Sequence, residues 1–321
     1  MEKWRKEFRV DPIPALISSN NRAIEYFTRR DLLHEKVEPV DALWELPEAK
    51  RLLRRQQEDG SWKYPGGGKE HLRSQEDYNQ IETYRNLGIL IEKYGLENGH
   101  PAIERAAGFL FSKQTEKGDF RGIYGNQYSP NYSAAIMELL IKAGYDADLR
   151  IEKGFRWLLS IRQNDGGWAI PLRTVGAKYA DIVMAITIEP DLSKPFSHLV
   201  TGVVLRAFAA STKYSKSPEA VTAGKLLASR FFKRDIYPDR NTPQYWESVP
   251  FPFWFTDIVS ALDSLSLLGF TGDNPDIAGA LDWLKRRQND DGLFELKLSK
   301  GKDKDLKFWI CLAICRLFKR F

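Results

Sequence analysis

The sequence predicts an all-α protein built from about five helix pairs in series. Three observations support this fold class. A short turn motif recurs along the chain, apolar residues follow the helical period of 3.6, and no segment shows a convincing strand alternation. The chain has 321 residues, of which 43% are hydrophobic, so it can bury a sizeable core. No Gly/Ser-rich linker divides it, and we expect one domain over residues 1–321.

One helix over about residues 22–33 is expected to precede the repeats, which run from about 45 to 320. Each turn follows an apolar helix, and a second apolar helix comes after it. The first helices end near 106–111, 155–161 and 281–284. Apolar stripes mark the second helices at 78–94, 132–143, 198–210, 255–265 and 306–318.

The recurring turn combines a glutamine, a glycine and an aromatic residue. Glycine can adopt positive φ and so end a helix, which suits it to this position. The gap between the third and fourth glutamines spans about two units, so a degraded copy is expected there, with Arg230 near the glutamine place. The four clear copies are Gln57-Gly60-Trp62, Gln114-Gly118-Phe120, Gln163-Gly166-Trp168 and Gln288-Gly292-Phe294.

Composition excludes several classes of protein. The net charge is +5 and spread along the chain, so we expect no nucleic-acid partner, and the basic clusters at 50–55 and 285–287 are interpreted as solvated helix faces. Two cysteines, Cys311 and Cys315, exclude a disulfide framework and suit a reducing compartment. We find no signal peptide and no apolar run long enough to span a membrane, and we expect a cytoplasmic protein.

The turn pattern resembles the QW repeat of the terpenoid cyclases and the related prenyltransferase superfamily. The closest copy runs from Lys153 to Trp168, and the resemblance covers roughly residues 45–310. Segments 14–33 and 246–257 are also similar to bacterial and archaeal proteins with prenyltransferase/squalene-oxidase-type repeats, mostly of unassigned function. The resemblance implies a single α/α toroid domain, in which outer helices ring inner helices. It also implies structural roles for Gln57, Trp62, Gln114, Gln163, Trp168 and Gln288.

The chemistry of those families is harder to find in this chain. The D-x-D-D acid motif of class II cyclases is absent, and the nearest segments, at 146–148 and 303–305, do not continue as required. The D-D-x-x-D metal motif is absent as well. The two cysteines have no histidine near them in sequence and are interpreted as buried thiols. We therefore expect no metal site and no cofactor.

The candidate site follows from the implied ring, in which the N-termini of the inner helices would meet at one mouth. Asp257 and Asp77 are the candidate catalytic acids, and each is expected in the first turn of an inner helix, where the dipole favours a carboxylate. The alternative for each is a plain helix cap. The aromatic segment 246–257 is either a wall for an apolar ligand or a plug that fills the ring. The candidate ligand contacts are Trp254, Tyr78, Tyr132, Asn131, His198, Trp246 and Phe255.

Three functions stay open at this point. The first is a terpenoid-cyclase-like toroid that binds an apolar isoprenoid or polycyclic molecule in a central cavity, with or without cyclase or prenyl-transfer chemistry. The second is a glycan-active lyase or hydrolase that uses paired carboxylates. The third is a non-catalytic binding or scaffold protein. Catalysis, peripheral membrane contact and the oligomeric state are left open by the sequence. The tryptophans Trp62, Trp168 and Trp283 are expected to be largely buried.

Overall fold

The computed structural model describes residues 3–66, 74–122, 125–177, 187–298 and 303–321. These residues are mostly helical, and the two-residue strands β1 (Ser248–Val249) and β2 (Lys297–Leu298) pair in parallel. The all-α class predicted from the sequence is thus confirmed. Contacts group the chain into a terminal unit, residues 1–39 with 213–321, and a middle unit, residues 40–212. That the chain forms one domain stays a prediction.

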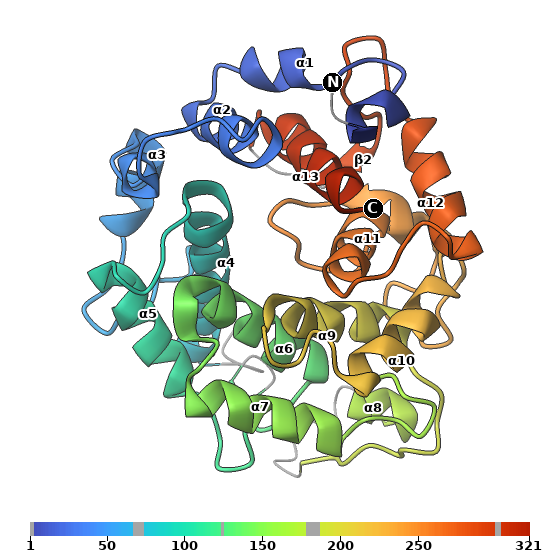
Figure 1. The fold of residues 1–321 in the computed structure, drawn as a ribbon. Coiled ribbons are helices and arrows are strands. Elements are labelled where there is room, and N and C mark those ends of the chain that lie inside the picture. The colour runs from blue at the N-terminus through green and yellow to red at the C-terminus, as the bar shows by residue number, and fades with distance from the viewer. Residues whose placement is uncertain (1–2, 67–73, 123–124, 178–186, 299–302) are drawn as a thin grey trace. The chain divides into compact units, whose positions relative to one another are not determined.

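The middle unit contains two rows of helices. Helices α4, α6 and α9 contact one another in sequence order, and α3, α5 and α7 each pack against a member of that first row. Figure 1 shows the second row lying along one side of the first. The helices are α3 (Pro47–Leu53), α4 (Gln75–Tyr94), α5 (Pro101–Phe111), α6 (Pro130–Leu140), α7 (Leu149–Ser160), α8 (Pro171–Thr174) and α9 (His198–Ala210), with a 3-10 helix at Val40–Leu43 and a π-helix at Ile141–Tyr145.

In the terminal unit α13 is the common partner. It packs against α11, α1 and α2, and α10 contacts α11. The helices are α1 (Ile13–Ile17), α2 (Arg22–Phe27), α10 (Pro218–Ala228), α11 (Ile258–Leu267), α12 (Pro275–Lys285) and α13 (Leu306–Arg320). Shorter segments are the 3-10 helices Lys3–Glu7 and Pro243–Glu247 and the π-helix Thr28–Leu32. The predicted helix over 22–33 is therefore an α-helix that continues as a π-turn.

Local sequence explains where the helices begin. A proline at the first position opens α3, α5, α6, α10 and α12, where its fixed φ suits the helix and its missing N–H is not needed. Side-chain oxygens of Ser217 and Asn274 accept backbone N–H groups at the starts of α10 and α12. These caps satisfy donors that a helix cannot pair internally.

The repeat turns share one side-chain hydrogen bond. Gln56 Nε2 donates to Gly60 O at 3.0 Å and to Ala102 O, at the start of α5, at 2.7 Å. Gln114 Nε2 donates in the same way to Gly118 O and to Arg150 O, at the start of α7. Each amide therefore joins the end of one helix of the second row to the start of the next.

In the structure, the four glutamines that the sequence aligned do not occupy equivalent positions in their turns. Counted from the glycine, Gln114 and Gln288 correspond to Gln56, whereas Gln57 and Gln163 stand one place later. Gln57 Nε2 donates to Ser61 Oγ, and Gln163 Nε2 donates to Asp191 O and Lys194 O, both at 2.8 Å.

Arginine replaces glutamine in two of the turns. Arg162 Nε donates to Gly166 O at 2.7 Å, and Arg230 Nη2 donates to Arg234 O at 2.6 Å. In each case the acceptor is the carbonyl four residues on, as in the glutamine turns. The degraded copy expected near Arg230 therefore forms the same side-chain hydrogen bond as the glutamine turns.

The two tryptophans of the turns are fixed by two hydrogen bonds each. Trp62 and Trp168 are 2% and 0% exposed, and their indole N–H groups donate to the carbonyls of Leu52 and Leu158. Their backbone N–H groups donate to hydroxyls of the neighbouring helix, Thr83 Oγ1 and Thr201 Oγ1. The expectation of burial is confirmed for both residues, whereas Trp283, near the end of α12, is half-buried.

We predict that Trp168→Ala lowers the free energy of unfolding by about 3–5 kcal/mol, because it empties a fully buried indole site and leaves the Leu158 carbonyl without this donor. Trp283→Ala should change stability far less, since that ring is already half-solvated. Urea unfolding of both variants checks this. Equal losses for the two would contradict the assignment of Trp168 as a repeat anchor.

Candidate functional site

Asp77 lies at the start of α4 and belongs to a capping box. Its Oδ2 accepts the Ser74 N–H at 2.9 Å, and its own N–H donates to Ser74 Oγ at 3.1 Å. The carboxylate is half-exposed. Tyr78 follows it on the helix, with its ring centroid 5.1 Å from that of Tyr64. Asp77 therefore holds the first turn of α4 and is still accessible to solvent.

Asp257 holds the start of α11 in the same manner. Its Oδ1 accepts the N–H groups of Val259 and Ser260 at 2.9 and 3.0 Å, and Ser260 Oγ accepts the Asp257 N–H. Asp257 is 0% exposed. Hydrogen bonds from backbone N–H groups at a helix N-terminus favour the ionised carboxylate. Both candidate acids are thus helix-capping groups.

The aromatic segment before α11 divides into buried and exposed members. Trp246 is 1% exposed, donates its indole N–H to Lys233 O at 3.0 Å and meets the Phe231 ring edge to face. Phe255 is 37% exposed, and the Arg240 guanidinium lies 3.4 Å from its ring centroid. Trp254 is half-buried. Trp246 is therefore a core residue of the terminal unit, whereas Trp254 and Phe255 keep part of their surface exposed.

The remaining candidates lie in the middle unit. Asn131 and Tyr132, in the first turn of α6, are half-buried, and Asn131 Oδ1 accepts the Ser129 hydroxyl. His198 opens α9 and is 6% exposed. The structure thus places these residues and Asp77 at helix N-termini of one unit and Asp257 in the other. A common cavity between the two sets stays a prediction.

Gln80, one turn after Asp77, is an unusual buried amide. It is 0% exposed, and neither Oε1 nor Nε2 has a hydrogen-bond partner among the described residues. A Cβ on Gly122 would lie 2.5 Å from Gln80 Oε1 and 2.9 Å from Asp77 Oδ1, so glycine is required for this approach. Leaving a buried amide unpaired costs about 1–3 kcal/mol, which marks Gln80 as a group that stability alone does not explain.

Sequence reasoning missed a buried ion pair. Arg206 of α9 and Glu138 of α6 are each 4% exposed, and Arg206 Nε donates to Glu138 Oε2 at 2.7 Å. Lys142 Nζ donates to Glu138 Oε1 at 2.8 Å, and Tyr84 of α4 hydrogen-bonds to Arg206. The available signal was that Glu138 and Arg206 are the only charged residues of their apolar helices.

Neighbouring charges and burial have opposite effects on the pKa of Glu138. Burial alone would raise the pKa of Glu138, but the Arg206 and Lys142 charges outweigh it and hold that pKa below its ordinary value of 4.5. Burial raises the pKa of Tyr84 to about 12, so the phenol stays protonated at neutral pH. The three helices of the first row are therefore joined by a charged, hydrogen-bonded cluster.

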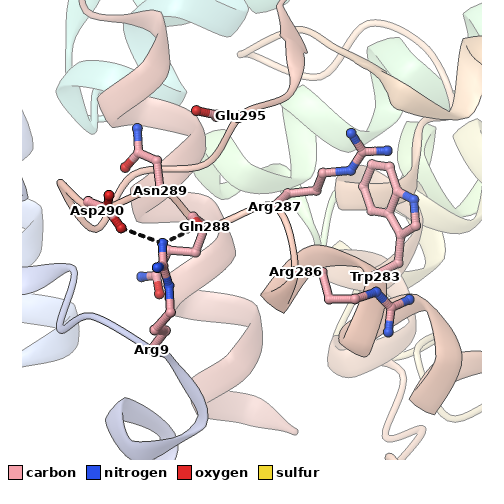
Figure 2. Close-up of a pocket in the computed structure, with 8 residues that line it drawn as sticks. All are labelled: Arg9, Trp283, Arg286, Arg287, Gln288, Asn289, Asp290 and Glu295. Atoms are coloured by element: carbon pink, nitrogen blue, oxygen red, sulfur yellow. Dashed lines mark hydrogen bonds and ion pairs between the residues drawn. The ribbon is translucent and has the colours of Figure 1, made fainter.

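Each unit also has open hollows. A hollow of about 340 Å³ in the middle unit is lined by Trp62 and Tyr64 with Glu82 and Asn86 of α4. In the terminal unit, a cleft of about 590 Å³ lies at the end of α12 and includes three arginines (Figure 2). Within the described ranges, no three His, Cys, Asp or Glu side chains gather in a way that suits a metal ion. No helix in the described part of the chain is long and apolar enough to cross a membrane.

Comparison with known proteins finds a family match over part of the chain. Residues 77–187, about a third of the chain, match the family model of the squalene-hopene cyclase C-terminal domain. The chain is therefore similar to the terpenoid cyclases, which confirms the resemblance drawn from the turns. No curated protein matches the sequence.

Solved structures resemble the chain at low identity. A polysaccharide lyase is 13% identical with a TM-score of 0.46, covering 87% of this chain and 85% of that one. A family 88 glycosyl hydrolase from Bacteroides vulgatus is 16% identical with a TM-score of 0.44, covering 88% of each chain. The type II terpene cyclase MstE from Scytonema is 13% identical with a TM-score of 0.36, covering 87% of this chain and 96% of that one. Likeness at this level does not discriminate between functions.

We predict that Gln80→Met raises the free energy of unfolding by about 1–3 kcal/mol, because methionine has a similar shape and removes an unpaired buried amide. Gln163→Met is the matched control. It should lower stability, because Gln163 Nε2 donates to two carbonyls that would lose their partner. Chemical unfolding measures both changes, and a stability loss in Gln80→Met would show that this amide is satisfied in the folded protein.

We predict that Arg206→Met costs about 3–5 kcal/mol at pH 7, because it leaves the Glu138 carboxylate buried without its main partner. The depressed pKa of Glu138 means that the wild-type pair stabilises the fold above about pH 4.5 and loses that contribution as pH falls. Protonated Glu138 needs no counter-charge, so the deficit of the variant should shrink in acid.

Arg156→Met is the control for this experiment. Arg156 forms an exposed pair with Glu152 at 3.6 Å, and such a pair contributes at most about 1 kcal/mol. Urea unfolding at pH 7 and pH 4 compares the two variants. A deficit in Arg206→Met that is unchanged between these pH values would count against the ion-pair explanation.

Proposed function

We propose that this protein binds an apolar, isoprenoid-like or polycyclic molecule on a terpenoid-cyclase-like helical scaffold. The observation that carries the proposal is the family match at 77–187, which spans α4, α6 and α7. Those helices include Tyr78 and Tyr132, two half-buried aromatics near the helix N-termini that the sequence singled out. Partly exposed aromatic faces suit an apolar or cationic ligand.

The ligand contacts we propose are the partly exposed members of the predicted set. In the middle unit these are Tyr78 and Tyr132. Trp254 and Phe255 belong to the terminal unit and are proposed separately, as contacts within that unit. An isoprenoid alcohol presents an apolar chain that suits such aromatic faces, and it serves as the test ligand.

Acid-initiated cyclisation is not part of the proposal. The D-x-D-D motif is absent from the sequence, and both candidate acids accept backbone N–H groups in capping boxes. The same bonding argues against the glycan-active alternative, which needs one carboxyl group that is readily protonated. Binding without this chemistry is the function that the geometry supports best.

We expect geranylgeraniol to bind the purified protein with quenching of tryptophan fluorescence, and Trp254→Ala to weaken binding about tenfold. Tyr245→Ala is the matched control, since Tyr245 is also an exposed aromatic of the same segment, at 39% exposure. It should leave the affinity unchanged. Absence of binding by the wild-type protein, or equal effects of the two variants, would contradict the proposal.

Asp257→Asn separates binding from catalysis. Asparagine also caps helices, so we expect this variant to fold and to bind geranylgeraniol with unchanged affinity. Mass spectrometry of extracts after long incubation should show unchanged alcohol with both proteins. A cyclised product that forms with the wild type and disappears with Asp257→Asn would establish Asp257 as an acid and overturn the capping assignment.

A further inference from the structure

The cleft of about 590 Å³ in the terminal unit lies where the last repeat turn meets the segment that precedes α1. Figure 2 shows Arg286 and Arg287 on either side of Trp283, with Arg9 and Asp290 across the cleft. The backbone of this segment is fixed, because Gln288 Oε1 accepts the Val10 N–H at 3.0 Å and Gln288 Nε2 donates to Val10 O at 2.7 Å. The cleft is thus built on the repeat framework and not on a loose loop.

Trp283 is more exposed than the aromatic residues at the same position in two other turns. Trp283 stands five residues before Gln288, and its counterparts Phe109 and Trp157 are 7% and 5% exposed. The Tyr128 ring covers Trp157, with centroids 5.2 Å apart. Trp283 is half-buried, with the Phe232 ring centroid 5.1 Å and the Arg287 guanidinium 4.6 Å from its centroid. The last turn therefore leaves part of an aromatic ring exposed beside a cation, at a position that is buried in the turns of Phe109 and Trp157.

The arginines of the cleft are weakly engaged. Arg9 pairs with Asp290 at 2.8 Å and donates to Gln288 O at 3.1 Å, but the Arg9 and Asp290 side chains are 61% and 91% exposed. Arg287 lies 3.7 Å from Glu247. The Arg286 side chain is exposed, and Asp282, one turn earlier, is an acidic neighbour. Exposed ion pairs contribute little to stability, whereas hydrogen bonds to charged groups are among the stronger ones. A multiply charged anion can therefore displace Asp290 and Glu247.

We propose that this cleft binds a small molecule that carries a phosphate or diphosphate group. Arg286, Arg287 and Arg9 supply the guanidinium donors, whose planar geometry matches phosphate oxygens, and Trp283 supplies an apolar wall for the rest of the ligand. The site goes beyond the isoprenoid-binding function proposed above and does not depend on it.

A second pair of arginines in the chain serves as a control for nonspecific attraction between exposed arginines and an anion. Arg54 and Arg55 precede Gln56 as Arg286 and Arg287 precede Gln288, and all four arginines are exposed. Arginines at a helix C-terminus also serve to offset the helix dipole, and that role is common to both pairs. In the first turn the place of Trp283 is taken by Arg51, which offers no aromatic wall.

Isothermal titration calorimetry with sodium pyrophosphate tests the proposal. We expect saturable binding by the wild-type protein that weakens with added salt. The double variant Arg286→Gln/Arg287→Gln should bind at least about tenfold more weakly, and Arg54→Gln/Arg55→Gln should bind like the wild type. Thermal unfolding in the absence of pyrophosphate checks that both variants keep the wild-type melting temperature.

Flotation with phosphatidylcholine vesicles that contain phosphatidic acid separates a soluble ligand from a lipid headgroup. We expect pyrophosphate to bind and the vesicles not to recruit the protein through these arginines. Equal losses of pyrophosphate binding in the two double variants would overturn the proposal, as would no binding by the wild type. Recruitment to vesicles without pyrophosphate binding would replace it with a membrane-surface role.

Discussion

One side-chain hydrogen bond, donated by the glutamine or arginine that begins each repeat turn, organises the structure around it. In the glutamine turns, one Nε2 group donates both to the carbonyl four residues on and to a carbonyl of the segment that follows in space. It thereby fixes the end of one helix and the position of the next. The indole of the same turn then fills the junction, as Trp168 does under α9. Arginine at 162 and 230 preserves the first of these bonds, because its N–H groups reach the same carbonyl.

This framework also decides what the acidic residues can do. Asp77 and Asp257 lie at the N-termini of α4 and α11, where unpaired backbone N–H groups need acceptors. Both carboxylates meet that need and are directed at their own helices. The proposed ligand contacts are therefore groups of another kind, the partly exposed aromatics.

Polar contacts between helices give the first row of the middle unit its specificity. An apolar contact between α6 and α9 tolerates many registers, whereas the Arg206–Glu138 pair is satisfied in one register only. Tyr84 and Lys142 extend the same cluster to α4 and to the end of α6. The charged cluster and the repeat amides therefore act together, one between neighbouring helices of the first row and the other along the second row.

The sequence by itself determined the helical class, the repeat turns, the degraded copy at Arg230 and the resemblance to terpenoid cyclases, because periodicity and turn chemistry are local. It placed Asp77 and Asp257 in the first turns of helices for the same reason. It could not determine that Gln56 and not Gln57 is the bridging amide, that Trp246 is core, or that Trp283 is half-solvated. Those outcomes, with the Arg206–Glu138 pair and the arginine cleft, depend on which distant segments meet, and only the tertiary structure decides that.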